Sequence, residues 1–74
     1  MDKIKRWSGM TKSHGFSVDV YDDADGETYL AKISTYTPLR FDDTEELRNK
    51  DIDQLQELAK KWIVKHCGKI SKFQ

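Results

Sequence analysis

The chain has few cysteine, proline and glycine residues: one cysteine, one proline and four glycines in 74 residues. Because Cys67 is single, no disulfide can form within the chain, which is typical of proteins kept in a reducing, intracellular setting. No apolar run is long enough to cross a bilayer. The start, MDKIKRW, lacks the apolar core of a signal peptide. These absences predict a small cytoplasmic protein.

The length suits one domain, 1–74, with one modest core. Charged residues make up 35% of the chain, and their formal sum is zero. That zero conceals a pattern: residues 1–14 are basic, residues 15–59 hold twelve acids against four bases, and residues 60–74 add five lysines. The basic ends and the acidic middle segment can each face a partner of opposite charge. The alternative, that these are solvated faces of a small protein, stays open.

Residues 16–33, FSVDVYDDADGETYLAKI, predict a β-hairpin with one buried side. Phe16, Val18 and Val20 alternate on one face, and a turn centred on residues 24–26 contains the favoured Asp-Gly pair. The other face of the first strand carries Ser17, Asp19 and Tyr21. We therefore expect one covered and one uncovered sheet face.

The second half of the chain predicts a helix. Asp43 and Glu46 form a capping box, and apolar residues then recur at helical spacing up to Gly68, a suitable helix stop. Leu47 is out of phase with this stripe, so a break near Asn49–Asp51 is plausible, with Asp51 and Gln54 as a second capping box.

The expected fold class is α+β, a small antiparallel sheet of three or four strands (about residues 1–41) with a helical part (about 44–67) packed on one face. The tail from Ile70 is either a frayed end or a final short strand. The expected core comprises Phe16, Val18, Val20, Ile33, Leu55, Leu58, Trp62 and Ile63.

The sequence predicts neither catalysis nor a cofactor. No nucleophile elbow, phosphate-binding glycine loop or HExxH pair is present. The acidic turn fails as a calcium loop, because Tyr21 and Lys32 would occupy positions that need carboxylates. His66 and Cys67 are neighbours on a helix and diverge by about 100°, which does not favour a metal site.

Nucleic-acid binding remains an alternative. Lys3, Lys5 and Arg6, together with the lysine-rich end of the helix, could form one basic patch. The acids of the hairpin argue against this reading, because they would repel phosphates.

Two tryptophans call for separate interpretations. Trp62 lies on the apolar stripe and is expected in the core. Trp7 lies in a basic segment, so it is either a lid on the sheet or an exposed anchor for a partner. Strand alternation places Tyr21 and Tyr36 on the face away from the helix.

The order of several short motifs carries a resemblance. They are Ile4-Lys5 with Ser8, the strand end Val20-Tyr21, the polar turn, Ala31-Lys32-Ile33, and residues 41–47, FDDTEEL. Over residues 1–47 this order resembles a small phage-encoded type I-F anti-CRISPR protein. The resemblance implies an antiparallel sheet packed against helices and no enzymatic activity. It also implies binding to backbone subunits of the crRNA-guided surveillance complex (Cascade, called Csy in type I-F), which blocks pairing with target DNA.

Of three key positions on the family's binding face, one is matched in this sequence and two differ. Tyr21 matches a tyrosine at a strand end on the family's binding face. The family's early aromatic falls on Arg6, with Trp7 one place later, and its second-strand glutamate falls on Ser34. The resemblance therefore predicts a phage-derived inhibitor with altered contacts, which docks on a basic, nucleic-acid-handling protein. Its expected partner-binding residues are Arg6, Trp7, Asp19, Tyr21, Asp22, Asp23, Asp25, Lys32, Ser34 and Tyr36.

A second likeness leads to a different partner. Residues 20–31 and 43–47 look like the HicB-like antitoxin domain, which neutralises a small RNA-cleaving toxin. That family usually carries a separate DNA-binding segment, and none is evident in this sequence.

Overall fold

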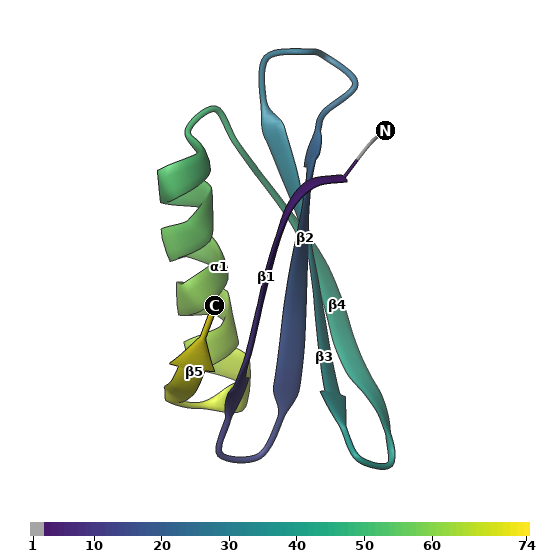
Figure 1. The fold of residues 1–74 in the computed structure, drawn as a ribbon, viewed down its shortest axis with the longest axis vertical. Coiled ribbons are helices and arrows are strands. Elements are labelled where there is room, and N and C mark those ends of the chain that lie inside the picture. Colours follow the sequence, from purple (N-terminus) through teal and green to yellow (C-terminus); the bar gives the residue numbers. More distant parts are fainter. Residues whose placement is uncertain (1–2) are drawn as a thin grey trace.

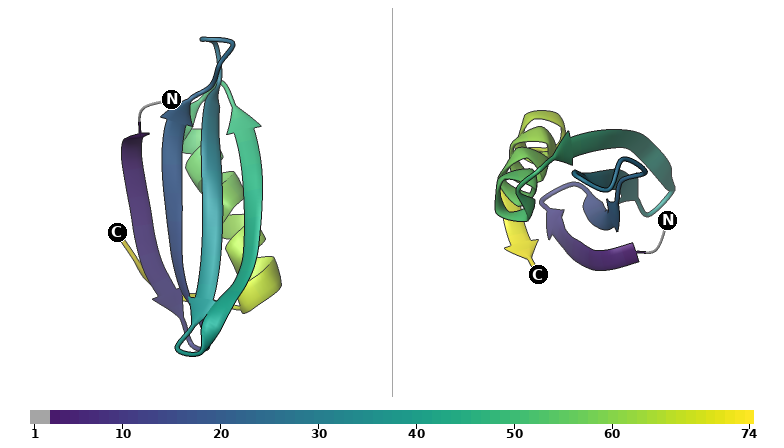
Figure 2. Two further views of the ribbon diagram at one scale, coloured as in Figure 1. Left: turned by 90° about the vertical axis from the view of Figure 1, so that its right-hand side faces the viewer. Right: turned by 90° about the horizontal axis from the view of Figure 1, so that it is seen from above.

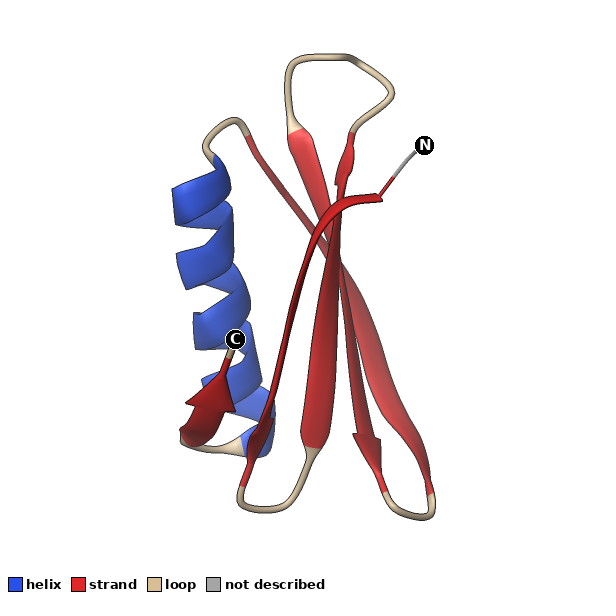
Figure 3. Ribbon diagram, viewed as in Figure 1, coloured by secondary structure: helices blue, strands red, loops and turns tan. Residues whose placement is uncertain are grey.

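The computed structural model describes residues 3–74, except for the side chains of residues 41–43. Its elements follow one another as β1 (Lys3–Thr11), β2 (Gly15–Asp22), β3 (Tyr29–Thr37), β4 (Arg40–Asn49), α1 (Ile52–Cys67) and β5 (Ile70–Phe73) (Figures 1 and 3).

The strands form one antiparallel sheet in the order β4-β3-β2-β1-β5. The first four strands are a meander, and the chain then crosses through α1 to add β5 beside β1. The helix lies against one face of the sheet, and the opposite face is uncovered (Figure 2, left). This arrangement confirms the predicted α+β class, with five strands instead of three or four.

The start of the helix differs from the prediction. Residues 44–49 belong to β4, and α1 begins only at Ile52. The physical reason is that β3 lies inside the sheet and needs a second neighbour for its backbone N–H and C=O groups. Residues 40–49 supply it, with Leu47 facing Ala31 in register. Asp43, the expected N-cap, therefore lies in a strand, and its side chain is outside the described part.

The second capping signal is the one that the chain uses. Oδ1 of Asp51 accepts hydrogen bonds from the backbone N–H groups of Asp53 (2.8 Å) and Gln54 (3.3 Å). At the other end, Gly68 adopts a φ of 94° and donates its N–H to the carbonyl of Val64. A positive φ suits glycine, so the predicted helix stop at Gly68 is confirmed.

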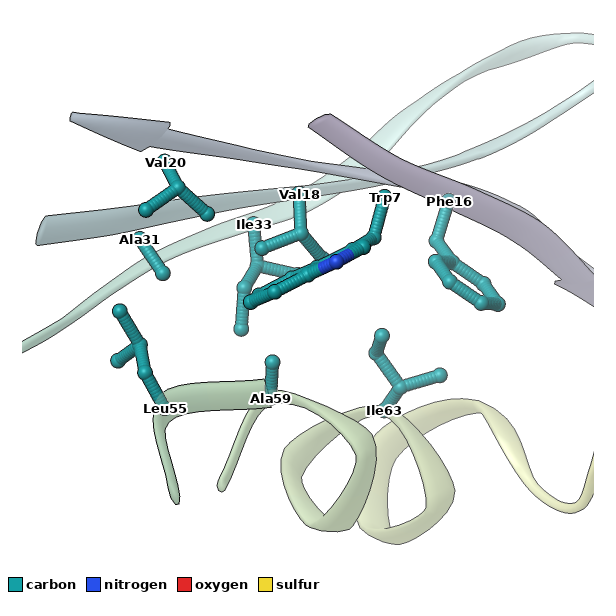
Figure 4. Close-up of a cluster of buried hydrophobic side chains, with 9 residues drawn as sticks. All are labelled: Trp7, Phe16, Val18, Val20, Ala31, Ile33, Leu55, Ala59 and Ile63. Atoms are coloured by element: carbon teal, nitrogen blue, oxygen red, sulfur yellow. The ribbon is translucent and has the colours of Figure 1, made fainter. Parts of the chain in front are cut away.

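The core lies between the helix and the covered sheet face (Figure 4). Leu55, Ala59 and Ile63, spaced four residues apart, form the buried stripe of α1. They pack against Trp7, Phe16, Val18, Val20, Ala31 and Ile33. Two expected core residues differ: Leu58 is 39% exposed, and Trp62 is only partly buried. Both flank the fully buried stripe, and Trp62 still packs against the edge of the core.

The tail is a strand, which settles the alternative that the sequence left open. β5 pairs with Gly9, Met10 and Thr11, and Ser8 and Gln74 exchange two backbone hydrogen bonds of 3.1 and 2.8 Å. A Cβ atom at Gly9 would collide with the backbone carbonyl of Lys72. Glycine therefore permits the close approach of β5 to β1.

Candidate functional site: the open sheet face

The uncovered face of strands β1 to β4, termed the open face, is built from cross-strand rows of residues. Because side chains alternate along a strand, residues that share a row in the register share a face. From the turn end downward, the rows are Lys3–Tyr21–Leu30–Arg48, Arg6–Asp19–Lys32–Glu46, Ser8–Ser17–Ser34–Thr44 and Met10–Gly15–Tyr36.

The second row alternates in charge across all four strands. Oδ1 of Asp19 lies 3.4 Å from Nε of Arg6 and 3.2 Å from Nζ of Lys3. Oε2 of Glu46 lies 3.9 Å from Nζ of Lys32. The contacts of Asp19 are charge contacts, because its Oδ1 has no hydrogen-bond donor among the described residues. The acids of this row are therefore already balanced within the chain.

Tyr21 and Lys32 meet on this face, as the sequence predicted. The Lys32 ammonium lies 5.2 Å from the centre of the Tyr21 ring, a cation–π arrangement. Leu30, in the same row as Tyr21, is only 2% exposed. The upper part of the open face therefore combines an aromatic ring, a cation and a small buried apolar centre.

The third row presents four hydroxyl groups, from Ser8, Ser17, Ser34 and Thr44. Between β3 and β4 the face is hollowed into a shallow depression of about 450 Å³, lined among others by Lys32, Ser34, Thr44 and Glu46. Hydroxyl groups both donate and accept hydrogen bonds, so this part of the face can match many polar surfaces.

The lower end of the open face is apolar. Met10 is 50% exposed and Tyr36 is 42% exposed. A Cβ atom at Gly15 would meet the Tyr36 ring, so that ring lies over the glycine between the two strands. Leu39, in the turn that follows β3, is 95% exposed. Exposed aromatic and apolar side chains next to a polar surface are typical of protein-binding anchors.

The acids of the β2–β3 turn have structural roles. Oδ1 of Asp25 accepts the backbone N–H groups of Glu27 and Thr28, and these bonds hold the pKa of Asp25 below its usual 3.8. The pKa of Asp23 is lowered by the N–H of Ala24, and also by Thr28 and Arg48. Such bonds stabilise the ionised carboxylate.

Of the predicted partner-binding acids, Asp22 is exposed at the end of β2. Asp23, by contrast, is engaged by Arg48, whose Nε lies 2.9 Å from its Oδ2. The turn therefore keeps an acidic rim, but two of its three predicted contact residues also hold the turn together.

Trp7 is a correction to the predicted surface. It is 4% exposed, faces Val18 in register and belongs to the core on the helix side. Its ring lies 6.3 Å from that of Phe73 in β5. It therefore covers the sheet beneath the helix as a core residue, and it cannot serve as an exposed contact for a partner.

The two basic ends of the chain, which the sequence left as one possible basic patch, meet in part. Nζ of Lys5 lies 5.9 Å from the centre of the Trp7 ring, Nζ of Lys60 lies 4.6 Å from the centre of the Phe73 ring, and these two rings are 6.3 Å apart. Lys3, Lys5 and Arg6 lie at the start of β1, whereas Lys12 follows its end, and a nine-residue strand spans roughly 26 Å. The helix α1 runs toward the end of the sheet at which β1 ends (Figure 1). The other bases are spread toward both ends of the molecule, and nucleic-acid binding stays an alternative.

Several residues of the open face escaped the sequence interpretation. The sequence predicts a helical part from about residue 44, which includes Glu46 and Arg48, so it does not predict their position beside Lys32 and Asp23. The alternation of Thr44, Glu46 and Arg48 with Glu45 and Leu47 was the available signal, but the capping box obscured it.

The described part of the chain holds neither a cluster of metal ligands nor a membrane-spanning helix. No three His, Cys, Asp or Glu side chains there gather as metal ligands. The helix of residues 52–67 is too short and too polar to span a membrane. Comparison of the chain with protein families, curated proteins and solved structures found no match.

Proposed function

We propose that this protein is a non-catalytic inhibitor that binds another macromolecule with the open face. On the resemblance of residues 1–47, the proposed partner is a backbone subunit of a type I CRISPR surveillance complex. The observation that carries the proposal is the division of the sheet, with the helix on one face and an uncovered, aromatic and charged surface on the other.

The composition of the open face supports protein binding. Interfaces draw most of their affinity from a few aromatic and arginine side chains surrounded by polar contacts. Tyr21, Tyr36 and Arg6 are of these types, and the hydroxyl row supplies polar contacts around them. The rows are fixed by the sheet ladder, so little backbone ordering is needed on binding.

The charge arrangement refines the expected contacts. The side chains of Arg6 and Lys32 are 57% and 46% exposed, whereas that of Asp19 is 23% exposed. The side chain of Glu46 is 50% exposed, so this row presents two cations and one acid at the surface, and further acids lie at the turn above it. A partner surface with acids opposite the rows and bases opposite the turn would be complementary, and the encounter would slow at high salt.

Binding to a purified type I-F surveillance complex tests the proposal. We expect stoichiometric binding by native mass spectrometry and loss of target DNA capture. Tyr36→Asp should weaken both effects at least about tenfold, because it places a charge at the apolar end of the face. Val64→Asp is the matched control: Val64 is 48% exposed on the helix and should tolerate the same change.

Three results would contradict the proposal. The complex could capture target DNA normally at saturating protein. Both variants could bind equally well, or Val64→Asp could be the variant that fails. The first result rejects this partner, and the other two reject the open face as the binding surface.

One observation favours a second candidate, DNA binding by the same face. In the four rows, the exposed cations Lys3, Arg6, Lys32 and Arg48 outnumber the one acid that is equally exposed, Glu46, and they lie around Tyr21. Cations neutralise phosphates and aromatic rings stack on bases. A gel shift with single-stranded and duplex DNA at several salt concentrations tests it. Retarded DNA that is released steeply as salt rises would support this candidate.

A further inference from the structure

The free edge of β4 is a second surface, which borders the open face and offers backbone groups instead of side chains. Among the described strands, β4 pairs with β3 alone, and it runs for ten residues, Arg40–Asn49. At the other edge of the sheet, β5 covers the second half of β1. An uncovered edge strand presents backbone N–H and C=O groups that can pair with another strand.

The direction of these groups can be read at Glu46. Its N–H donates to Oε1 of Glu45 at 3.0 Å, which shows that β3 does not use it. In an antiparallel ladder, every second residue directs its N–H and C=O away from a given neighbour. Thr44 and Arg48, two residues to either side of Glu46, therefore share its direction. Three alternate residues thus offer donors and acceptors along the free edge.

The charge of the edge identifies what can pair with it. Four of the five residues 42–46 are acidic. A second copy paired antiparallel about Thr44 would set Asp43 opposite Glu45, and like charges in directly opposed positions destabilise a sheet. The same acids attract lysine or arginine on an added strand. In this register the edge disfavours self-association, and its acids favour a basic segment of another protein.

We propose that the β4 edge binds an extended, lysine- or arginine-bearing segment of a protein partner by strand addition. On binding, a carbonyl of that segment replaces Oε1 of Glu45 as the acceptor for the N–H of Glu46. The released Glu45 carboxylate then pairs with a cation of the segment. This proposal does not rest on the proposed inhibitor function, because it uses the outward backbone groups of β4, although the side chains of Thr44, Glu46 and Arg48 also belong to the open face.

The test uses a synthetic octapeptide of alternating lysine and valine, titrated into the full ¹⁵N-labelled chain. We expect saturable shifts at the amides of Thr44, Glu46 and Arg48, and slower hydrogen exchange at Glu46. Glu46→Pro removes an outward N–H and is tolerated at an edge. It should weaken binding about tenfold, as expected for one lost ladder bond and its disturbed neighbours. Glu46→Ala is the control, because it removes the same carboxylate but keeps the N–H.

Further controls keep the result decisive. Unchanged amide shifts at Val18 and Ile33 show that Glu46→Pro is folded. If that variant does not fold, a peptide methylated on alternate backbone nitrogens replaces it, and we expect it not to bind. Equal binding by Glu46→Pro and Glu46→Ala overturns the proposal. So do shifts confined to Tyr21 and Tyr36, an absence of binding, or peptide-independent dimers that Glu46→Pro abolishes.

Discussion

The ammonium nitrogen of Lys32 lies 5.2 Å from the centre of the Tyr21 ring, although the two residues are diagonal neighbours in the β2–β3 register. We expect a coupling of about 0.5–1 kcal/mol between them, which is usual for an exposed cation–π pair. A double-mutant cycle with Tyr21→Ala and Lys32→Ala, read by urea unfolding, measures it. Additive effects of the two substitutions would show that the contact contributes nothing.

Trp7 is expected to support the fold and to take no direct part in binding. Trp7→Ala should lower the free energy of unfolding by about 3–5 kcal/mol, as for other buried aromatic side chains. Tyr36→Ala, on the open face, should cost within about 1 kcal/mol. Circular dichroism during urea unfolding compares the two. A stable Trp7→Ala protein that has lost its partner would instead make Trp7 a contact residue.

Gly9 and Gly15 form a natural pair for a steric test. Gly9→Ala places a methyl group on the backbone carbonyl of Lys72, which cannot move without displacing β5. Gly15→Ala meets the side chain of Tyr36, which can rotate away. We expect Gly9→Ala to cost at least about 1–3 kcal/mol, the range for overpacking. Gly15→Ala should cost clearly less in the same unfolding assay, and the reverse order would argue against the β1–β5 pairing.

The N-cap of α1 distinguishes the two capping signals in the sequence. Asp51→Ala should destabilise the protein by about 0.5–2 kcal/mol, because the N–H groups of Asp53 and Gln54 lose their acceptor. Asp51→Asn keeps an acceptor oxygen and should be nearly neutral. Thermal unfolding followed by circular dichroism suffices for the comparison. Equal losses in both variants would show that charge, and not capping, matters at this position.

The β2–β3 turn should make stability depend on pH below about 4. The pKa values of Asp23 and Asp25 are lowered by hydrogen bonds from backbone N–H groups, so folding favours their ionised forms. This stabilisation is complete above the unfolded pKa and is lost as the pH falls through the folded values. The double variant Asp23→Asn, Asp25→Asn should lose stability less steeply between pH 5 and 2. Carboxyl ¹³C shifts of the unmodified protein give both midpoints directly, and midpoints at or above 3.8 would contradict the assignment.

The hairpin and the open face followed from the sequence because strand alternation is a local property. Val18 and Val20 point to the helix, and Asp19 and Tyr21 point away, as their spacing predicts. The turn and Gly68 were also local signals, with residues suited to a positive φ. These parts needed no knowledge of the rest of the chain.

The parts that differed depend on partners distant in the sequence. A capping box at residues 43–46 is a sound local signal, yet β3 requires a ladder partner on that side, and the longer-range pairing prevails. Trp7 is buried because the helix and Phe73 come to lie over it, some fifty residues later. The charge pairs of Glu46 and Arg48 could not be foreseen while both residues were assigned to a helix.

The addition of β5 beside β1 has a consequence for synthesis on the ribosome. Ser8 emerges early, but the partner that closes its edge, Gln74, is 66 positions further along the chain. The meander of β1 to β4 can therefore assemble while the first strand still has an open side. A nascent chain stalled before residue 70 would expose that side together with the ring of Trp7, and it would be a natural substrate for chaperones.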